Sequence, residues 1–251
     1  MRQLLLGVLM GLLAVPAAAQ SADDLDRKAL IEELDRSPNA EQLARKARSV
    51  ELLRAKGIPV LDSLPVIVDE DRSLRRTKKE VAERALALMI AAVKGETGDQ
   101  ALIDTLIDQY DAGALFTLAE RAFINDPNPS EQMRVEMSWR YEGVHTLLWA
   151  LGFYDALMPP DQIVDVYEMG TLLRDLGPDG LRRKAQLRPQ AAVLDMTDLV
   201  YRMNWAAVEA RVNGEPVPAG IHPGIVYERH YALNWLIGYA GLGWDEMRTD
   251  T

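Results

Sequence analysis

The stretch that decides the fold reads MSWRYEGVHTLLWAL and covers residues 137–151. Trp139, Glu142, Thr146 and Trp149 recur in it every three or four residues. That spacing places the four side chains on one face of an α-helix. The stretch therefore predicts a helix whose apolar surface carries polar and aromatic residues.

The predicted helix extends in both directions from this stretch. Ser130 is a suitable N-cap, and Gly152 follows the last apolar residue, Leu151, as a stop. Arg140 and His145 lie on the helix faces next to the one that carries Trp139. The sequence thus predicts one continuous helix over residues 130–151.

Two later strings have the same character. The first, DLVYRMNWAAVEAR, covers residues 198–211, and the second, YERHYALNWLI, covers residues 227–237. In the first, Asp198 and Arg202 are an ion-pair candidate with i, i+4 spacing, and Tyr201 and Trp205 are neighbours on the same face. In the second, Val226, His230, Leu233 and Ile237 form an apolar stripe, so His230 is expected on a buried face and Asn234 one turn further on.

The aromatic residues of the chain gather in these strings. All five Trp, seven of eight Tyr and all three His lie at or after Ser130. The N-terminal half consists mainly of helix-favouring residues, with a capping-box pattern at Thr77–Glu80. Residues 58–71, which contain prolines and β-branched residues, are expected to form an extended arm across the surface.

These patterns predict an all-α, single-domain irregular helical bundle with the extended Pro-containing arm near residues 58–71. No internal repeat and no alternating strand pattern is visible. The 251 residues can bury one substantial core. The expected helices cover residues 21–36, 39–56, 77–93, 99–110, 114–124, 130–151, 161–176, 195–212 and 225–239, with a basic turn at 182–184.

The composition excludes several classes of function. The net charge of −10 argues against a nucleic-acid partner, because a phosphate backbone attracts a basic face. With no cysteine there is no disulfide, thiolate metal site or cysteine nucleophile. Glycine-rich nucleotide motifs, a nucleophile elbow and paired metal-ligand histidines are missing, so no metal or cofactor is predicted. Acidic and basic residues are spread evenly, so no basic patch can be delimited along the chain.

The N-terminus predicts export. Residues 1–19 combine Arg2, an apolar run from Leu4 to Val15 and the small residues 17–19, which is typical of a signal peptide cleaved after Ala19. The apolar run is too short for a stable membrane span. We therefore expect a periplasmic or secreted protein, with an N-terminal helical extension over residues 20–42 and a single helical domain over residues 43–251.

The three strings supply the candidate site. If their polar side chains open into one pocket, they would bind a small polar or anionic ligand; otherwise they form a buried polar core. If the side chains form a pocket, we expect Arg140 and Arg229 to bind an anionic group and Glu142 or His230 to accept or donate a proton. The candidate residues are Trp139, Arg140, Glu142, His145, Tyr201, Arg202, Trp205, Glu228, Arg229, His230 and Asn234.

The chain also resembles a bacterial family, the domain of unknown function 4272 family. The resemblance rests on LLRAKGIPV at 52–60, SWRYEGVHTLLWALG at 138–152, LDMTDLVYRMNWAAVEARVNG at 194–214 and GIVYERHYALNWL at 224–236. Shorter matches are RTKKEVAERALAL at 76–88, PSEQ at 129–132, KAQLRP at 184–189 and WDEMRTDT at 244–251. It implies a mainly helical single domain from about residue 43 onward. It implies no activity and no catalytic residues, and residues 1–42 are a departure from it.

Three functions are compatible with these observations. The favoured one is an exported interaction protein of the cell envelope, with a basic protein partner, such as a toxin that an immunity-like protein neutralises, suited to the negative charge. An alternative is a small-molecule-binding domain or enzyme with a pocket between residues 138–149, 198–209 and 226–237. In the third, the motif residues only specify the bundle. Binding is favoured over catalysis because no nucleophile can be nominated.

Overall fold

The computed structural model describes residue 29 and residues 37–251. The regular structure among these residues is helical, with no strand. This confirms the predicted all-α bundle. The predicted signal peptide and the predicted helix over residues 21–36 lie outside the described residues, apart from Ala29. The helices are α2 (Ala40–Ala55), α3 (Lys78–Thr97), α4 (Gln100–Tyr110), α5 (Leu118–Asn125), α6 (Glu131–Ser138), α7 (Arg140–Ala150), α8 (Val166–Lys184), α9 (Gln190–Asn213), α10 (Pro223–Leu236) and the 3-10 helix η1 (Tyr239–Gly241).

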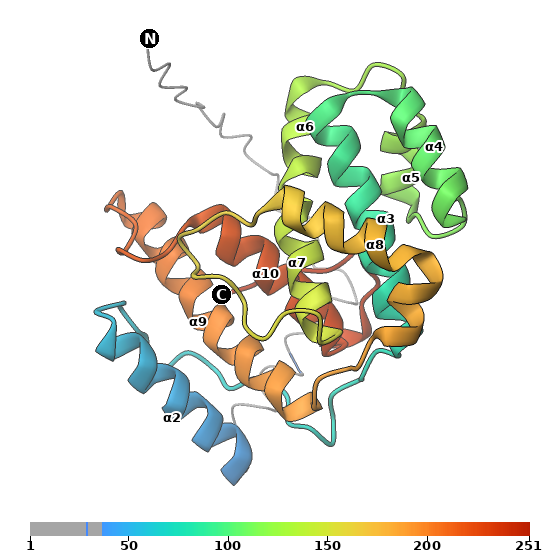
Figure 1. The fold of residues 1–251 in the computed structure, drawn as a ribbon. Coiled ribbons are helices and arrows are strands. Elements are labelled where there is room, and N and C mark those ends of the chain that lie inside the picture. The colour runs from blue at the N-terminus through green and yellow to red at the C-terminus, as the bar shows by residue number, and fades with distance from the viewer. Residues whose placement is uncertain (1–28, 30–36) are drawn as a thin grey trace.

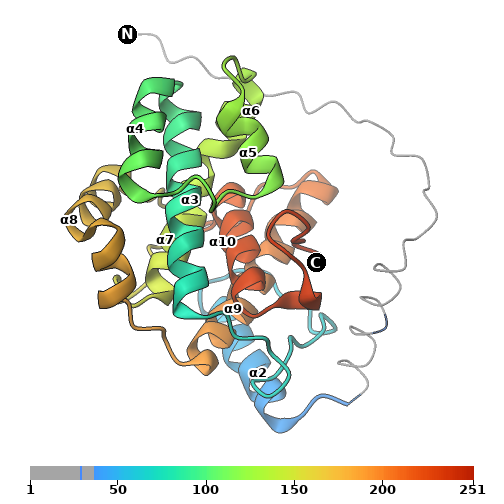
Figure 2. The same ribbon diagram turned by 90° about the vertical axis from the view of Figure 1, so that its right-hand side faces the viewer.

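The helices are arranged around α3, α7 and α10. The C-terminal half of α3 packs with α4, α5 and α6 at one end of the molecule (Figures 1 and 2). At the other end, α2 lies along α9. Between these ends α10 packs on one side against α7 and on the other against α9. The three polar-aromatic strings therefore lie on α7, α9 and α10, with α10 in the middle.

The apolar core is divided, whereas the sequence suggested one core. The larger cluster joins α3, α7, α8, α10 and the C-terminal tail. The smaller one includes Leu53, Ile58, Met203 and Val226 and lies between α2, the arm and α9. Helix α9 contributes buried apolar residues to both clusters, and its charged residues Asp198 and Arg202 are buried as well. None of the described helices is both long enough and apolar enough to cross a bilayer.

The arm over residues 58–71 forms neither helix nor strand. Turns at residues 61–64 and 69–73 interrupt it, so it is irregular and not extended throughout as predicted. Gln42 Nε2 donates to the Ile67 carbonyl oxygen at 2.7 Å, and Arg202 Nη2 donates to that of Pro65 at 3.2 Å. The arm is thus held on the bundle by helical side chains that bond to its backbone.

The predicted continuous helix over residues 130–151 is wrong. It is broken at Trp139, which separates α6 from α7. The Glu142 N–H donates to the Trp139 carbonyl oxygen at 3.1 Å, so the chain tightens there to an i to i+3 turn. Trp139 stacks on His222 with ring centroids 5.2 Å apart, and its ring leaves no room for a side chain at Gly224. Packing of Trp139 against the start of α10 accompanies the break.

The helix predicted over residues 77–93 is too short, and Gly95 does not end it. α3 continues through it to Thr97 and ends at Gly98, which has the left-handed φ of 66°. A Cβ at Gly95 would lie 2.5 Å from the Arg134 carbonyl oxygen and 2.8 Å from the Ser138 nitrogen. Gly95 is therefore the point where the backbones of α3 and α6 come into contact.

Other boundaries shift by a few residues. α5 begins at its N-cap Thr117 and α8 at its N-cap Asp165, both later than predicted. α8 also runs beyond the predicted stop: Gly177 breaks the helical geometry, and Pro178 starts a further stretch that includes residues 182–184. α9 begins earlier than predicted, directly after Pro189.

Candidate functional site

A buried ion pair between α7 and α10 is the centre of the candidate site. Arg229 donates from Nε and Nη2 to Glu142 Oε2 at 3.2 and 3.0 Å, and both side chains are 2% exposed. The pair also holds the segment over residues 153–165, which links α7 to α8. Glu142 Oε1 accepts from the Val164 N–H at 2.9 Å, and Arg229 Nη1 donates to the Met158 carbonyl oxygen at 2.6 Å. This segment covers the ion pair.

A second pair between the same helices lies closer to the surface. Arg140 Nη1 donates to both carboxylate oxygens of Glu228, at 3.1 and 2.9 Å. The Arg140 guanidinium also lies over the Tyr231 ring, 5.0 Å from its centroid. Burial raises the pKa of Glu228, and the charge of Arg140 opposes that rise. The guanidinium is therefore already engaged by a carboxylate and an aromatic face.

The two candidate histidines are buried on opposite sides of this region. The His145 ring lies 4.7 Å from the Tyr154 ring, and the His230 ring lies 5.6 Å from the Tyr201 ring. Burial lowers the pKa of His145 to about 4, helped by the charge of Arg229, and that of His230 to about 3. Both rings are thus neutral at pH 7. Their Nδ1 atoms are buried without a hydrogen-bond partner among the described residues.

The string on α9 contributes a third ion pair. Arg202 donates to the two carboxylate oxygens of Asp198 at 2.9 and 2.8 Å, and both side chains are 1% exposed. This pair follows the predicted i, i+4 spacing. Tyr201 packs on His230, across from its own helix. Trp205 is half-buried beside the smaller apolar cluster.

The α9 and α10 strings also hold the C-terminal tail. Asn234 Nδ2 donates to the Arg248 carbonyl oxygen at 2.8 Å, and Asn204 Nδ2 donates to that of Thr249 at 3.4 Å. As in the arm, the acceptors in the tail are backbone oxygens.

The predicted site residues are therefore brought together in part. Arg140, Glu142 and His145 on α7 face α10, where Glu228 and Arg229 meet them. The α9 residues lie on the other side of α10 and contact it mainly through Tyr201 and His230. The strings form successive layers with α10 between the other two.

Other buried charges were missed from the sequence. Lys94 is 1% exposed and donates to Gln100 Oε1 and to the Ile124 and Asp126 carbonyl oxygens, each at 2.7 Å. Arg84 pairs with Glu120 inside the bundle. For Lys94 a signal existed, since it is the single charge in the apolar run over residues 85–95. Among the described residues no cluster of three or more His, Asp or Glu side chains could hold a metal ion.

The matching family model is described as "Domain of unknown function (DUF4272)", and it matches residues 45–247. The chain belongs to the DUF4272 family. The match confirms the resemblance, and it includes all three polar-aromatic strings. No curated protein and no solved structure matches the chain. In this DUF4272 protein, the ion pairs between α7 and α10 and the segment over residues 153–165 all lie inside the matched range.

Proposed function

We propose that the protein is an exported interaction protein of the bacterial cell envelope that binds its partner through its surface. The observation that carries the proposal is the pairing of the three candidate arginines. Arg140, Arg202 and Arg229 each engage a carboxylate within the bundle. A small anionic ligand would have to separate a buried ion pair to reach any of them, which is costly. Surface binding requires no such separation.

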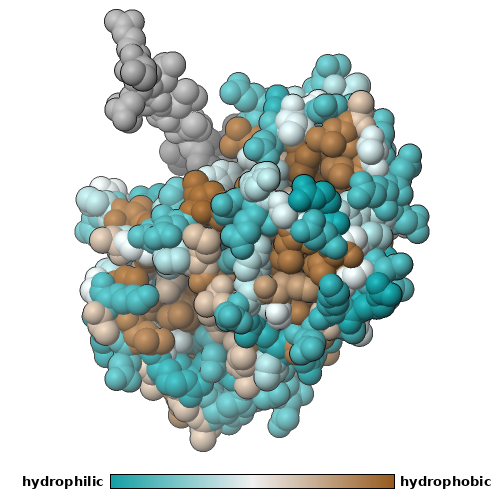
Figure 3. All heavy atoms as spheres, in the orientation of Figure 1, coloured by the Kyte–Doolittle hydropathy of each residue, from teal (hydrophilic) through white to brown (hydrophobic). Residues whose placement is uncertain are grey.

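The charge and the surface support a polar partner. A net charge of −10 attracts a basic protein over long range and speeds its association. On the face shown in Figure 3, hydrophobic residues occur in separate areas among hydrophilic ones. The most exposed large hydrophobic residues also lie on different helices: Leu118 on α5, Tyr167 on α8 and Val212 on α9.

The location outside the cytoplasm rests on the N-terminal sequence. The apolar run and the small residues before Gln20 have the pattern of a cleaved export signal. A chain without cysteine folds independently of the redox state of its compartment, which suits the periplasm.

Affinity capture from periplasmic extract tests the proposal. The chain from Gln20 onward is immobilised, and retained proteins are compared at about 0.05 M and about 0.5 M salt, since the higher concentration screens surface charges. We expect a basic protein that is retained at low salt and that binds the purified chain in a 1:1 titration. The absence of any salt-sensitive partner that also binds in purified form would contradict the proposal.

A second candidate function is small-molecule binding beneath the segment over residues 153–165. It is favoured by the buried Nδ1 atom of His145, whose ring packs on Tyr154 of this segment and which has no hydrogen-bond partner among the described residues. Such atoms suit a ligand that offers a hydrogen-bond donor or acceptor. A thermal-shift screen with small carboxylates and phosphates tests it. Stabilisation that His145→Gln abolishes would support this function, and stabilisation that persists in that variant would count against it.

A further inference from the structure

The segment over residues 153–165, yellow in Figure 1, connects the end of α7 to the start of α8 and forms neither helix nor strand. We call it the strap. It follows Gly152, whose left-handed φ of 80° turns the chain out of α7, and it contains the adjacent Pro159 and Pro160. Hydrogen bonds with the bundle, and not regular structure of its own, hold the strap in place.

Three polar side chains lie buried where the strap crosses the bundle. They are Glu142 and His145 on α7 and Arg229 on α10, and none of them is more than 3% exposed. Glu142 and Arg229 pair with each other, and both also hold the strap, through the Val164 N–H and the Met158 carbonyl oxygen. We call Glu142, His145 and Arg229 the polar cluster.

The polar cluster has no group that would balance a second positive charge. The Glu142 carboxylate is already engaged by Arg229, and His145 Nδ1 has no hydrogen-bond partner among the described residues. Burial lowers the pKa of His145 to about 4, and the charge of Arg229 contributes to this lowering. A proton on His145 therefore places an unbalanced charge inside the protein, which is costly as long as water is excluded.

Two further carboxylates lie near the strap but not within the polar cluster. The His145 ring packs on the Tyr154 ring with centroids 4.7 Å apart. Burial raises the pKa of Tyr154 to about 12, and the charges of Glu168 and Asp165 at the start of α8 add to that rise. Both carboxylates are exposed, so water screens their effect on the buried histidine.

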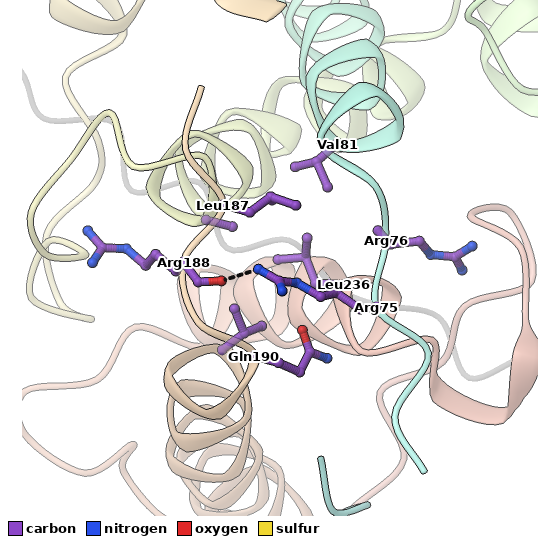
Figure 4. A pocket seen from close by; sticks show the side chains of 9 residues that line it. Arg75, Arg76, Val81, Leu187, Arg188, Gln190 and Leu236 are labelled. Atoms are coloured by element: carbon purple, nitrogen blue, oxygen red, sulfur yellow. Dashed lines mark hydrogen bonds between the residues drawn. The ribbon is translucent and has the colours of Figure 1, made fainter. Parts of the chain in front are cut away.

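The start of the strap is fastened independently of the polar cluster. Arg188 Nη2 donates to the Asp155 carbonyl oxygen at 2.9 Å, and Figure 4 shows this side chain pointing away from the small cavity that Arg75 crosses. Arg75 Nη2 in turn donates to the Arg188 carbonyl oxygen at 2.8 Å. Further along the strap, the His222 N–H donates to the Pro160 carbonyl oxygen at 2.7 Å. A guanidinium is already charged, so acid leaves the contact at Asp155 unchanged.

We propose that the strap is an acid-sensitive cover, which opens when His145 takes up a proton. Residues 156–164 lift from the bundle about the contact at Asp155, and water then reaches the polar cluster and solvates its extra charge. Opening regulates access to the small-molecule site of the second candidate function, and it rests on that proposal for its purpose.

Proton linkage gives the direction and the size of the effect. With the strap open, His145 regains the ordinary pKa of 6.5, whereas with the strap closed its pKa is about 4. The open form therefore binds more protons in acid, and acid favours it. These two values correspond to a rise of about 20-fold in the ratio of open to closed strap between pH 7 and pH 5.

Amide hydrogen exchange of the chain from Gln20 onward, followed by NMR at pH 7 and pH 5 without any ligand, tests the proposal. The reporters are the N–H groups of Val164 and His222, whose hydrogen bonds break when the strap lifts. Their protection, corrected for the intrinsic exchange rate, should fall about 20-fold in the parent chain and stay nearly constant in His145→Gln. Unchanged protection in the parent chain, or an equal fall in His145→Gln, would overturn the proposal.

His230→Gln is the matched control. His230 is also a buried histidine, but it packs on Tyr201 of α9 and stays buried when the strap opens. This variant should keep the fall of about 20-fold. If it removes the fall, the reporter amides exchange through unfolding of the whole molecule, and the proposal fails. The parent chain and this control decide the outcome even if His145→Gln does not fold. Because no ligand is present, failure of the strap to open is distinct from failure of the small-molecule site to bind.

Discussion

The Arg229 guanidinium serves two roles at once. It neutralises Glu142 and holds the segment over residues 153–165 through the Met158 carbonyl oxygen. We expect Arg229→Met to lower the free energy of unfolding by about 3–5 kcal/mol, because the Glu142 charge is left buried without its partner. Urea unfolding at pH 7 measures this change.

Two controls make this prediction specific. Adding Glu142→Leu to Arg229→Met removes the isolated charge, so the double variant should be more stable than the single one. Arg54→Met breaks the exposed pair with Asp62, and it should cost less than about 1 kcal/mol. If Arg54→Met and Arg229→Met lower the free energy of unfolding equally, burial of the ion pair does not account for the loss.

The buried histidines predict how stability depends on pH. Both have folded pKa values below the ordinary 6.5, at about 4 for His145 and about 3 for His230. The unfolded chain therefore binds more protons than the folded one below pH 6.5. Stability from these residues is fully present above pH 6.5 and falls by about 1.4 kcal/mol per pH unit for each histidine as the pH drops toward 4.

Urea titrations between pH 7 and pH 4.5 check this dependence. His145→Gln and His230→Gln should each reduce the slope of stability against pH, whatever their effect on stability at pH 7. If both variants keep the slope of the parent chain, the loss of stability in acid arises from other groups.

Whether the sequence predicts a contact between two residues depends on how far apart they lie along the chain. Asp198 and Arg202 were predicted as a pair because they are one helical turn apart. Glu142 and Arg229 are 87 residues apart, so nothing local indicates which carboxylate meets which guanidinium. Burial of His230 followed from the apolar stripe around it, but its contact with Tyr201 needs the packing of α9 on α10.

At the scale of elements, glycine within α3 controls how closely two helices approach. Gly95→Ala would place a Cβ against the backbone of α6, at 2.5 and 2.8 Å from its atoms. We expect a loss of about 1–3 kcal/mol, since backbone cannot move aside as a side chain end can. Differential scanning calorimetry of the variant measures the effect.

Gly170 is the matched control for this substitution. It also lies within a helix, α8, but a Cβ there would meet only the flexible end of Met89 at 3.6 Å. Gly170→Ala should be neutral or stabilising, because alanine favours the helix. A loss as large as that for Gly95→Ala would show that the contact with α6 is not the cause.

The presence of a helix was easier to predict than its first and last residues. Periodicity located α2 and α4, whose N-caps Asn39 and Asp99 are the first residues of the predicted ranges. The errors at Gly95 and Trp139 share one cause, which is packing between helices. A glycine in a sequence looks the same whether it ends a helix or lets another helix approach, and a tryptophan gives no sign that it will end one.

At the scale of the whole molecule, the all-α class was predictable but the order of the layers was not. Nearly all residues of α7 and α10 are buried, so neither helix has one apolar face that indicates its neighbour.

The whole-chain prediction that remains to be tested is export. Intact mass analysis of the protein from a periplasmic fraction should give a chain that begins at Gln20. Leu6→Arg, which interrupts the apolar run, should leave the full-length chain in the cytoplasm. A periplasmic chain that retains Met1, or a parent protein found only in the cytoplasm, would contradict the predicted signal.

The side chains that hold the irregular segments do so through main-chain atoms. Arg229 bonds to Met158, Arg202 to Pro65 and Asn234 to Arg248, in each case at the carbonyl oxygen. A carbonyl oxygen is present whatever residue occupies the position. These bonds therefore leave the residue types at positions 158, 65 and 248 free to vary. They do not permit replacement of the whole segments, because Val66 of the arm and Trp244 of the tail are buried.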